Sequence, residues 1–328
     1  MLSLFRTNQI VANFLLLFYA VFLRFSVFWV APSFEPTFNG VLGEYTIRSI
    51  GTLGVFPFIL GVILLSLQAL LINITISRYR TAGELSLFPG LFYILLASSF
   101  PEFLFLSPAL IANTFYILAL MEMMHTYKNN AAAGRIVNAG FWIAIGSLFY
   151  FSHIVFLILA FSALGILRAF RLKEAIMVII GFAVPYVIAN VYFFWTDQWS
   201  MFWQQQFVNT WSFLDVSRLS IQGDQLFRLI FLVLITLVAL LSFRRYTVKK
   251  KIQVQKNINI IYWALFWGAL TFLFQADIQY DHFLILLPPL GILLSINFLQ
   301  MKPPTAESLH LLLYVGIIVS HFLPLLLN

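Results

Sequence analysis

Two charged residues four positions apart could take part in a group-transfer reaction. Glu44 and Arg48 occur in the segment GEYTIRSIG, and a spacing of four puts both side chains on one face of a helix. A carboxylate there could accept a proton from an attacking hydroxyl, while the guanidinium stabilises a departing phosphate. The alternative is that the two residues only form a surface ion pair.

Five further polar residues stand at the ends of apolar segments or inside them. Glu102, in SSFPEFLF, is a second candidate for the base, or else it stabilises the start of the helix that follows. Asp281 and His282, in QYDHFLILLPP, could orient a phosphate or a sugar, or anchor the chain at an interface. Arg24 and Arg228 lie within apolar segments, where a charge is costly without a partner. Each could contact a phosphate in an outward cavity, reach the surface, or join a structural ion pair.

Other kinds of chemistry are absent from the sequence. There is no cysteine, which excludes disulfides, thiolate metal sites and a cysteine nucleophile. Neither HExxH nor a Gly-rich phosphate loop occurs, and the histidines do not share a helix face at the spacing of metal ligands. We therefore expect no metal and no cofactor. The net charge of +7 comes from basic residues scattered between apolar runs, so we expect no nucleic-acid partner.

The composition predicts that these residues are held by a polytopic, all-α transmembrane bundle. Hydrophobic residues are 62% of 328 positions and charged residues 9%, and the mean hydropathy is +0.94. A soluble domain is nearer half apolar and a quarter charged. A helix needs about twenty apolar residues to cross the membrane, and about eleven segments approach that length. They are 9–31, 50–74, 85–100, 104–124, 137–151, 153–169, 175–195, 225–243, 258–275, 283–300 and 308–327.

We expect about nine to eleven crossings, because two neighbouring segments are short. Segments 137–151 and 153–169 either cross with little tilt or form a re-entrant hairpin, and later orientations are the same in both cases. The first segment, 9–31, is too long for the core of a signal peptide and contains Arg24, so we interpret it as an uncleaved anchor. Residues 1–328 are expected to form one membrane domain.

The basic residues predict the orientation. With the N-terminus in the cytoplasm, fifteen of the nineteen Lys and Arg residues lie on the inner side. These are Arg6, Arg78, Arg80, Lys128, Arg135, Arg168, Arg171, Lys173, Arg244, Arg245, Lys249, Lys250, Lys251, Lys256 and Lys302. Such an asymmetry is typical of inner loops. We therefore expect a cytoplasmic N-terminus, a periplasmic C-terminus and a location in a bacterial cytoplasmic (inner) membrane.

Two outer loops are long enough to hold a site, and they cover residues 31–49 and 196–224. The second contains WSMFWQQQFVNTWSFL, in which Trp199, Trp203 and Trp211 recur at intervals of four and eight. This spacing places the three rings near one helical face, and Trp is favoured at the membrane surface. The pattern predicts a partly helical segment lying along the outer interface.

The segment QYDHFLILLPPLGILLS, residues 279–295, resembles the late helix of GT-C-type glycosyltransferases, where a polar or aromatic cluster leads into a double proline. FSHIVFLILAFSALGILRAF and IIGFAVPYVIANVYFFW, which includes Pro185, resemble the middle helices of those enzymes. Over most of its length the chain is also similar to an uncharacterised family of multi-spanning bacterial membrane proteins. That similarity runs through LLINITISRYR, NTFYILALMEM and FWIAIGSLFYFSHIVF.

The GT-C resemblance implies a sugar donor carried on a lipid phosphate, used at the outer face, with acidic catalytic residues in the first outer loop. Those enzymes often have an adjacent acidic pair there, whereas Glu35 and Glu44 are nine residues apart in this chain. The leading hypothesis is therefore a GT-C-like glycosyltransferase, active or inactive, that uses a polyprenyl-phosphate-linked sugar on the periplasmic face.

The roles that this hypothesis assigns are the following. Glu44 or Glu102 would be the base, Arg24, Arg48 and Arg228 would contact the phosphate, and Asp281 and His282 would orient the donor. The first alternative is a non-enzymatic scaffold or subunit of an envelope-assembly complex, and the second is a transporter. In each case membrane lipids are expected partners.

Overall fold

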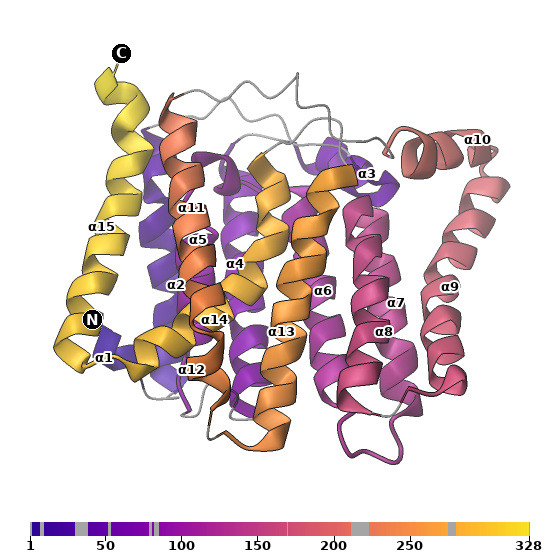
Figure 1. Cartoon of the computed structure of the whole chain (residues 1–328). Helices are drawn as coiled ribbons and strands as arrows, with labels where there is room; N and C mark the ends of the chain where they lie inside the picture. The colour runs from indigo at the N-terminus through magenta and orange to yellow at the C-terminus, as the bar shows by residue number, and fades with distance from the viewer. Residues whose placement is uncertain are drawn as a thin grey trace.

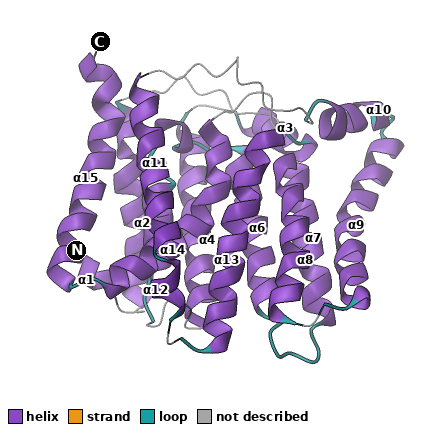
Figure 2. Ribbon diagram, viewed as in Figure 1, coloured by secondary structure: helices purple, strands orange, loops and turns teal. Residues whose placement is uncertain are grey.

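The computed structural model describes residues 2–6, 10–29, 39–51, 54–78, 81, 85–168, 170–210, 223–248, 250–274 and 280–327. The fold is 85% helical, and the described residues contain no strand (Figure 2). The helices are α1 (Leu2–Phe5), α2 (Ile10–Arg24), α3 (Val41–Ile50), α4 (Val55–Arg78), α5 (Phe88–Leu96), α6 (Pro108–Met124), α7 (Ala133–Phe149), α8 (Phe156–Leu167), α9 (Leu172–Trp195), α10 (Trp199–Trp203), α11 (Gly223–Leu241), α12 (Phe243–Thr247), α13 (Ile252–Leu270), α14 (Leu287–Gln300) and α15 (Pro303–Leu327). Short 3₁₀ segments are η1 (Phe25–Phe28), η2 (Pro101–Phe103), η3 (Phe151–Val155), η6 (Thr271–Phe274) and η7 (Tyr280–Leu286), and η4 (Gln204–Val208) is a π-helix.

The long helices run side by side along one common direction (Figure 1). The N-terminus and α1 lie at one end of this bundle, and the C-terminus lies at the other end together with α3 and α10. We call these the α1 end and the α3 end. At the α3 end, α10 lies across the direction of the long helices, as expected for a segment in the headgroup layer.

Six helical stretches within the described residues are long and apolar enough to cross a membrane. They are Val11–Phe28, Val55–Arg78, Leu172–Trp195, Ile252–Phe274, Tyr280–Gln300 and Pro303–Phe322. Four shorter apolar helices are Pro108–Met124, Ala133–Phe149, Phe151–Leu167 and Leu229–Leu241. The prediction of an all-helical membrane protein is thus confirmed, while the number of about eleven crossings and the orientation stay predictions.

One expected span is shorter than the sequence suggested. The apolar segment 85–100 forms a helix only over α5, which has nine residues and therefore rises only about 13 Å. It begins near the α1 end, where the backbone N–H of Leu87 donates to the carbonyl of Phe5 at 2.9 Å. The chain then leaves α-helical geometry until Pro108, which opens α6, and contains only the short 3₁₀ segment η2 in between. Residues 97–107 thus form an irregular, mostly buried segment inside the bundle, which we call the α5–α6 connection.

Helices α5 and α14 form the centre of the bundle. Every residue of α5 is buried, as is every residue of α14 from Leu287 to Leu299. The two helices approach closely, because a Cβ added to Gly291 would lie 2.8 Å from the Cα of Tyr93. A helix that is apolar all round is expected at such a position, and the sequence LFYILL of α5 has no polar face.

Helix α9 stands at the periphery and contacts the bundle mainly through α7. Gly140 of α7 and Gly181 of α9 permit this contact, since an added Cβ at Gly140 would collide with the carbonyl of Val178 and one at Gly181 with that of Val137. Small residues at such positions let two membrane helices approach closely. The opposite side of α9 is exposed and apolar, and comprises Ile176, Ile179, Ile180, Val184, Val187, Ile188 and Val191. This face is suited to contact with lipid.

Candidate functional site

Arg24 lies entirely inside the bundle and caps the C-terminal end of α5. Its side chain is 0% exposed. Nη2 donates to the carbonyl of Ala97 at 2.9 Å, Nη1 to the carbonyl of Leu104 at 3.2 Å, and Nε to Oγ of Ser98 at 3.3 Å. Ala97 is the residue that ends α5, where helix carbonyls lack partners and the helix dipole favours a cation. The guanidinium therefore replaces the hydrogen bonds that a continuing helix would make.

A histidine from α15 extends this cap. The Nε2 atom of His321 donates to the carbonyl of Ser98 at 2.9 Å, and its Nδ1 accepts from the hydroxyl of Ser26 at 2.7 Å. The polar groups at the break after α5 are thus bonded to residues from α2 and α15, and Ser26 of η1 bonds to the α15 histidine. The partners of Arg24 in these contacts are uncharged, so its role here is structural. The structural alternative predicted from the sequence was an ion pair, and the contacts are instead hydrogen bonds to neutral groups.

Glu102 and Asp281 lie on two short 3₁₀ segments that contact one another, η2 and η7. The ring of Phe100 stacks on that of Tyr280 at a centroid distance of 5.9 Å, which joins the two segments. Asp281 is buried and Glu102 is partly buried. Glu102 also falls between Ala97 and Leu104, the two carbonyl residues that Arg24 holds. The fold therefore brings the segments carrying Arg24, Glu102 and Asp281 into one region.

His282 belongs to a buried hydrogen-bonded network. Its Nε2 donates to Oγ1 of Thr271 at 2.8 Å, because that hydroxyl itself donates to the carbonyl of Gly268. Its Nδ1 then accepts from the hydroxyl of Tyr150 at 2.9 Å. Both ring nitrogens are occupied, so in this arrangement His282 joins η7 to η6 and to Tyr150 between α7 and η3, and it has no nitrogen left for a substrate.

Three further polar residues in apolar segments form buried hydrogen bonds and were not predicted as site residues: His153 in η3, Asn113 in α6 and Gln68 in α4. Nε2 of His153 donates to the side-chain oxygen of Asn113 at 3.2 Å, and the amide of Asn113 donates to the carbonyl of Leu284 at 2.8 Å. In α4, the Gln68 amide donates to the carbonyl of Leu110 and its oxygen accepts from Tyr93. Isolated Asn, Gln and His in apolar segments were the available signal, because such groups need partners inside a membrane.

Glu44 and Arg48 line a pocket of about 250 Å³ at the α3 end, which we call the α3–α10 pocket. The two side chains form an ion pair, with Glu44 14% and Arg48 73% exposed. The other lining residues on α3 are Val41, Tyr45 and Ser49, and Gln198, Met201 and Gln205 come from α10 and its flanks. The pocket thus combines a carboxylate, a cation and several neutral hydrogen-bonding groups.

Gln206 of the π-helix fixes the two walls of this pocket relative to one another. Its Oε1 accepts from the backbone N–H of Val41 at 3.0 Å, and its Nε2 donates to the carbonyl of Ser147 at 2.8 Å. The first bond satisfies a free N–H group in the first turn of α3. On the other face of α10, Trp199 stacks on Trp203 at a centroid distance of 6.2 Å, and both rings are half-exposed. Within the segment predicted to lie along the outer interface, residues 199–208 are therefore helical, while residues 211–222 lie outside the described residues.

The predicted site residues thus fall into separate groups. Glu44 and Arg48 share the α3–α10 pocket, and Arg24 lies with the segments of Glu102, Asp281 and His282 around the α5–α6 connection. Arg228 is in α11, but its side chain lies outside the described residues, as does Glu35 of the first outer loop. Among the described residues, no group of three His, Cys, Asp or Glu side chains could hold a metal ion.

No protein-family model matches this chain, and comparisons with curated proteins and with solved structures found no match either. The resemblance to GT-C glycosyltransferases stays a prediction, and any assignment of function depends on the geometry.

Proposed function

We propose that this protein is a GT-C-like glycosyltransferase of a bacterial inner membrane, and that the α3–α10 pocket holds its reacting groups. One observation carries the proposal, namely that Glu44 and Arg48 line the same pocket. In the proposed orientation, with the N-terminus in the cytoplasm, the pocket opens on the periplasmic side. The donor would be a sugar on a polyprenyl-phosphate-type lipid, and the acceptor a lipid or glycan hydroxyl.

The chemistry assigns a role to each charge. The acceptor hydroxyl attacks the anomeric carbon, the bond from that carbon to the phosphate oxygen breaks, and its electron pair leaves with the phosphate. The Glu44 carboxylate takes the hydroxyl proton, as inverting glycosyl transfer requires. The Arg48 guanidinium, now paired with Glu44, contacts the phosphate and stabilises its growing charge. The neutral groups that can bind sugar hydroxyls are those of Tyr45, Ser49, Gln198 and Gln205.

The aromatic face of α10, on the other side of that helix from the pocket, suits a lipid-linked donor. Trp199 and Trp203 present half-exposed rings on α10, at the level where Trp side chains favour the headgroup layer. A phosphate attached to a membrane-embedded chain is held at this same level. The donor could therefore enter the pocket from the membrane without leaving the bilayer.

The test is a transfer assay on the whole protein in lipid nanodiscs, with a radiolabelled polyprenyl-phosphate sugar and membrane-extracted glycan as acceptor. Glu44→Gln should lower the transfer rate about 10²–10⁴-fold, since it removes the base but leaves the shape unchanged. Arg48→Gln should also slow transfer, and Arg244→Gln at the α1 end is the matched control with the same loss of charge. Full activity in both pocket variants would exclude this site. If only Glu102→Gln abolished transfer, Glu102 in the α5–α6 connection would be the base instead of Glu44.

A second candidate function is a scaffold in an envelope-assembly complex, and the exposed face of α9 favours it. That helix contacts the bundle mainly through α7, which leaves a continuous apolar surface open to a second protein. Cysteines placed at Ile180 and Val187 would test this candidate by cross-linking in native membranes. Cross-links to one specific partner protein, together with no transfer in the assay above, would favour the scaffold over the enzyme.

A further inference from the structure

A second polar pocket lies at the α1 end of the bundle, opposite the α3–α10 pocket. It has a volume of about 170 Å³ and lies between the α6–α7 and α8–α9 connections. We call it the basic pocket. It is lined by Lys128, Asn129, Asn130, Leu167, Arg168 and Arg171. Three of these six residues are cationic and none is acidic.

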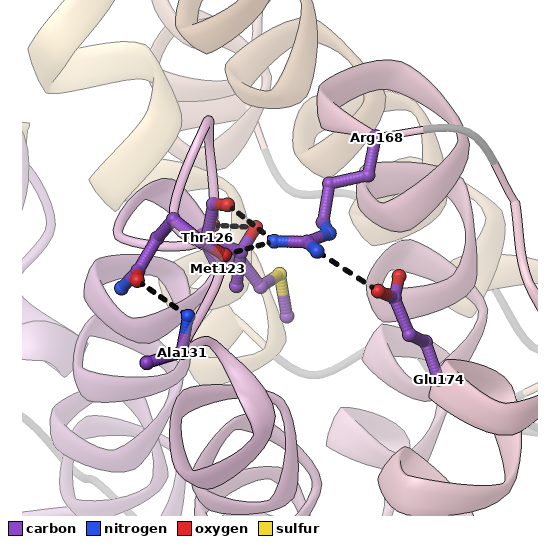
Figure 3. Close-up of polar contacts among 6 residues, drawn as sticks. Met123, Thr126, Ala131, Arg168 and Glu174 are labelled. Carbon is purple, nitrogen blue, oxygen red and sulfur yellow. Dashed lines mark hydrogen bonds and ion pairs between the residues drawn. The ribbon is translucent and has the colours of Figure 1, made fainter.

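Arg168 gives the basic pocket a fixed shape. Its Nη1 donates to the carbonyls of Thr126 (3.0 Å) and Asn129, and its Nη2 pairs with the carboxylate of Glu174 at 3.1 Å. Figure 3 shows this guanidinium between Thr126 and Glu174, so that it links the connection after α6 to the first turn of α9. Lys128 has a φ of +52°, a left-handed conformation that the bonds to its neighbours hold in place. The wall of the pocket is therefore built before any ligand arrives.

The basic pocket has a net positive charge even when the ion pair between Arg168 and Glu174 is taken into account. Glu174 neutralises Arg168, which leaves the charges of Lys128 and Arg171. Lys256 adds another cation beside the pocket, since its Nζ donates to the carbonyl of Leu167 at 3.3 Å and lies 5.2 Å from the ring centre of Tyr127. Ammonium, guanidinium and amide donors around one cavity match the oxygens of a phosphate group.

The surroundings of Arg171 point to a ligand that belongs to the membrane. Its neighbours Phe170 and Leu172 are 59% and 73% exposed, so apolar side chains flank the cation on both sides. Leu172 begins α9, whose exposed apolar face continues away from this point into the lipid layer. The rim of the pocket is therefore at headgroup depth, where an apolar chain and an anion meet.

We propose that the basic pocket binds the phosphate diester headgroup of an anionic phospholipid from the leaflet at the α1 end. Lys128 and Arg171 contact the phosphate oxygens, the side chains of Asn129 and Asn130 contribute neutral donors, and Phe170 and Leu172 contact the upper acyl chain. Basic pockets between transmembrane helices are suited to such headgroups. This site is independent of the proposed transferase activity, because it is at the other end of the molecule.

The test is native mass spectrometry of the full chain released from nanodiscs of phosphatidylcholine with one-fifth phosphatidylglycerol. The wild-type protein should retain phosphatidylglycerol in preference to phosphatidylcholine. Each pocket charge removed should weaken retention about fivefold, so Lys128→Gln with Arg171→Gln should lower it about 25-fold. The matched control is Lys250→Gln with Lys251→Gln, which removes two charges at the same end but outside the pocket. Arg168 is left unchanged because it holds the fold of the pocket.

Three results would overturn the proposal. The first is unchanged retention in the Lys128 and Arg171 double variant at an unaltered melting temperature, and the second is an equal loss in the Lys250 and Lys251 control. The third concerns the source of the phosphate. If millimolar inorganic phosphate displaces phosphatidylglycerol completely, the pocket binds free phosphate and not a lipid.

Discussion

The guanidinium of Arg24 and the carbonyl of Ala97 are 2.9 Å apart, although the two residues are 73 positions apart in the sequence. Ala97 is the C-cap residue of a nine-residue helix, inside a bundle whose other helices include six long enough to cross a membrane. When a helix ends inside an apolar bundle, its last backbone carbonyls have no water molecule to accept a hydrogen bond from. The guanidinium of Arg24 has several N–H groups and can therefore donate to more than one of these carbonyls at once.

Replacing Arg24 by Ala should therefore destabilise the protein. Each carbonyl left without a donor costs about 1–3 kcal/mol, and Ala97 and Leu104 both lose theirs. Guanidinium unfolding in detergent, followed by tryptophan fluorescence, measures the change. Arg48→Ala is the control, because its exposed ion pair contributes about 1 kcal/mol or less. Equal stability of the two variants would show that the cap is unimportant.

The contact between α7 and α9 should be sensitive to one methyl group. Gly181→Ala places a Cβ against the carbonyl of Val137, and overpacking of this kind costs about 1–3 kcal/mol. Gly165→Ala in α8 is the matched control, since nothing lies within 4 Å of its added Cβ and alanine is the better helix former. Thermal unfolding in detergent should show a lower midpoint for the first variant and an equal or higher one for the second. The reverse order would mean that α9 does not contact α7 through Gly181.

Gln206→Leu should separate the walls of the α3–α10 pocket. The substitution removes the acceptor for the Val41 N–H and the donor for the Ser147 carbonyl, both of which are buried. A spin-label pair at Tyr45 and Gln198 should then report a broader distance distribution by pulsed electron resonance. Gln205→Leu, at a neighbouring pocket position, is the control and should leave the distribution narrow. Identical distributions for both variants would contradict a joining role for Gln206.

The absence of cysteine allows the orientation to be measured without a background signal. Single cysteines at Gln198 and Lys302 lie at the α3 end and the α1 end. In intact cells, a membrane-impermeant maleimide should label Gln198→Cys and should label Lys302→Cys only after permeabilisation. The physical reason is the excess of basic residues at the α1 end, which disfavours its translocation. Labelling in the opposite pattern would invert the proposed topology.

The sequence predicted the class of fold well because composition and segment length are sufficient for that purpose. It overestimated the helix in segment 85–100, since Ala97, Ser98, Ser99 and Phe100 are compatible with both a helix and a buried irregular segment. Pro101 and Pro108 were visible signals of the break, as proline cannot supply the N–H that a helix interior needs. Hydropathy alone does not register that restriction.

The site was harder to predict because its contacts join distant parts of the chain. The four-residue spacing of Glu44 and Arg48 correctly indicated a shared helix face, which is a local property. The partners of Arg24 could not be found in the same way, because backbone carbonyls carry no sequence signal. Gln206 was equally hidden, as one of three consecutive glutamines of which it alone is fully buried and bonds to α3.

The bond between Ser26 and His321 joins residues 295 positions apart, and the one between His321 and Ser98 spans 223 positions. Translation delivers these segments to the membrane at very different times, so α5 must insert while part of its polar end still awaits its final donor. A nascent chain interrupted before α15 would present an incompletely bonded helix end within the bilayer. Such an end is a feature that membrane insertases could shield and that membrane proteases could recognise.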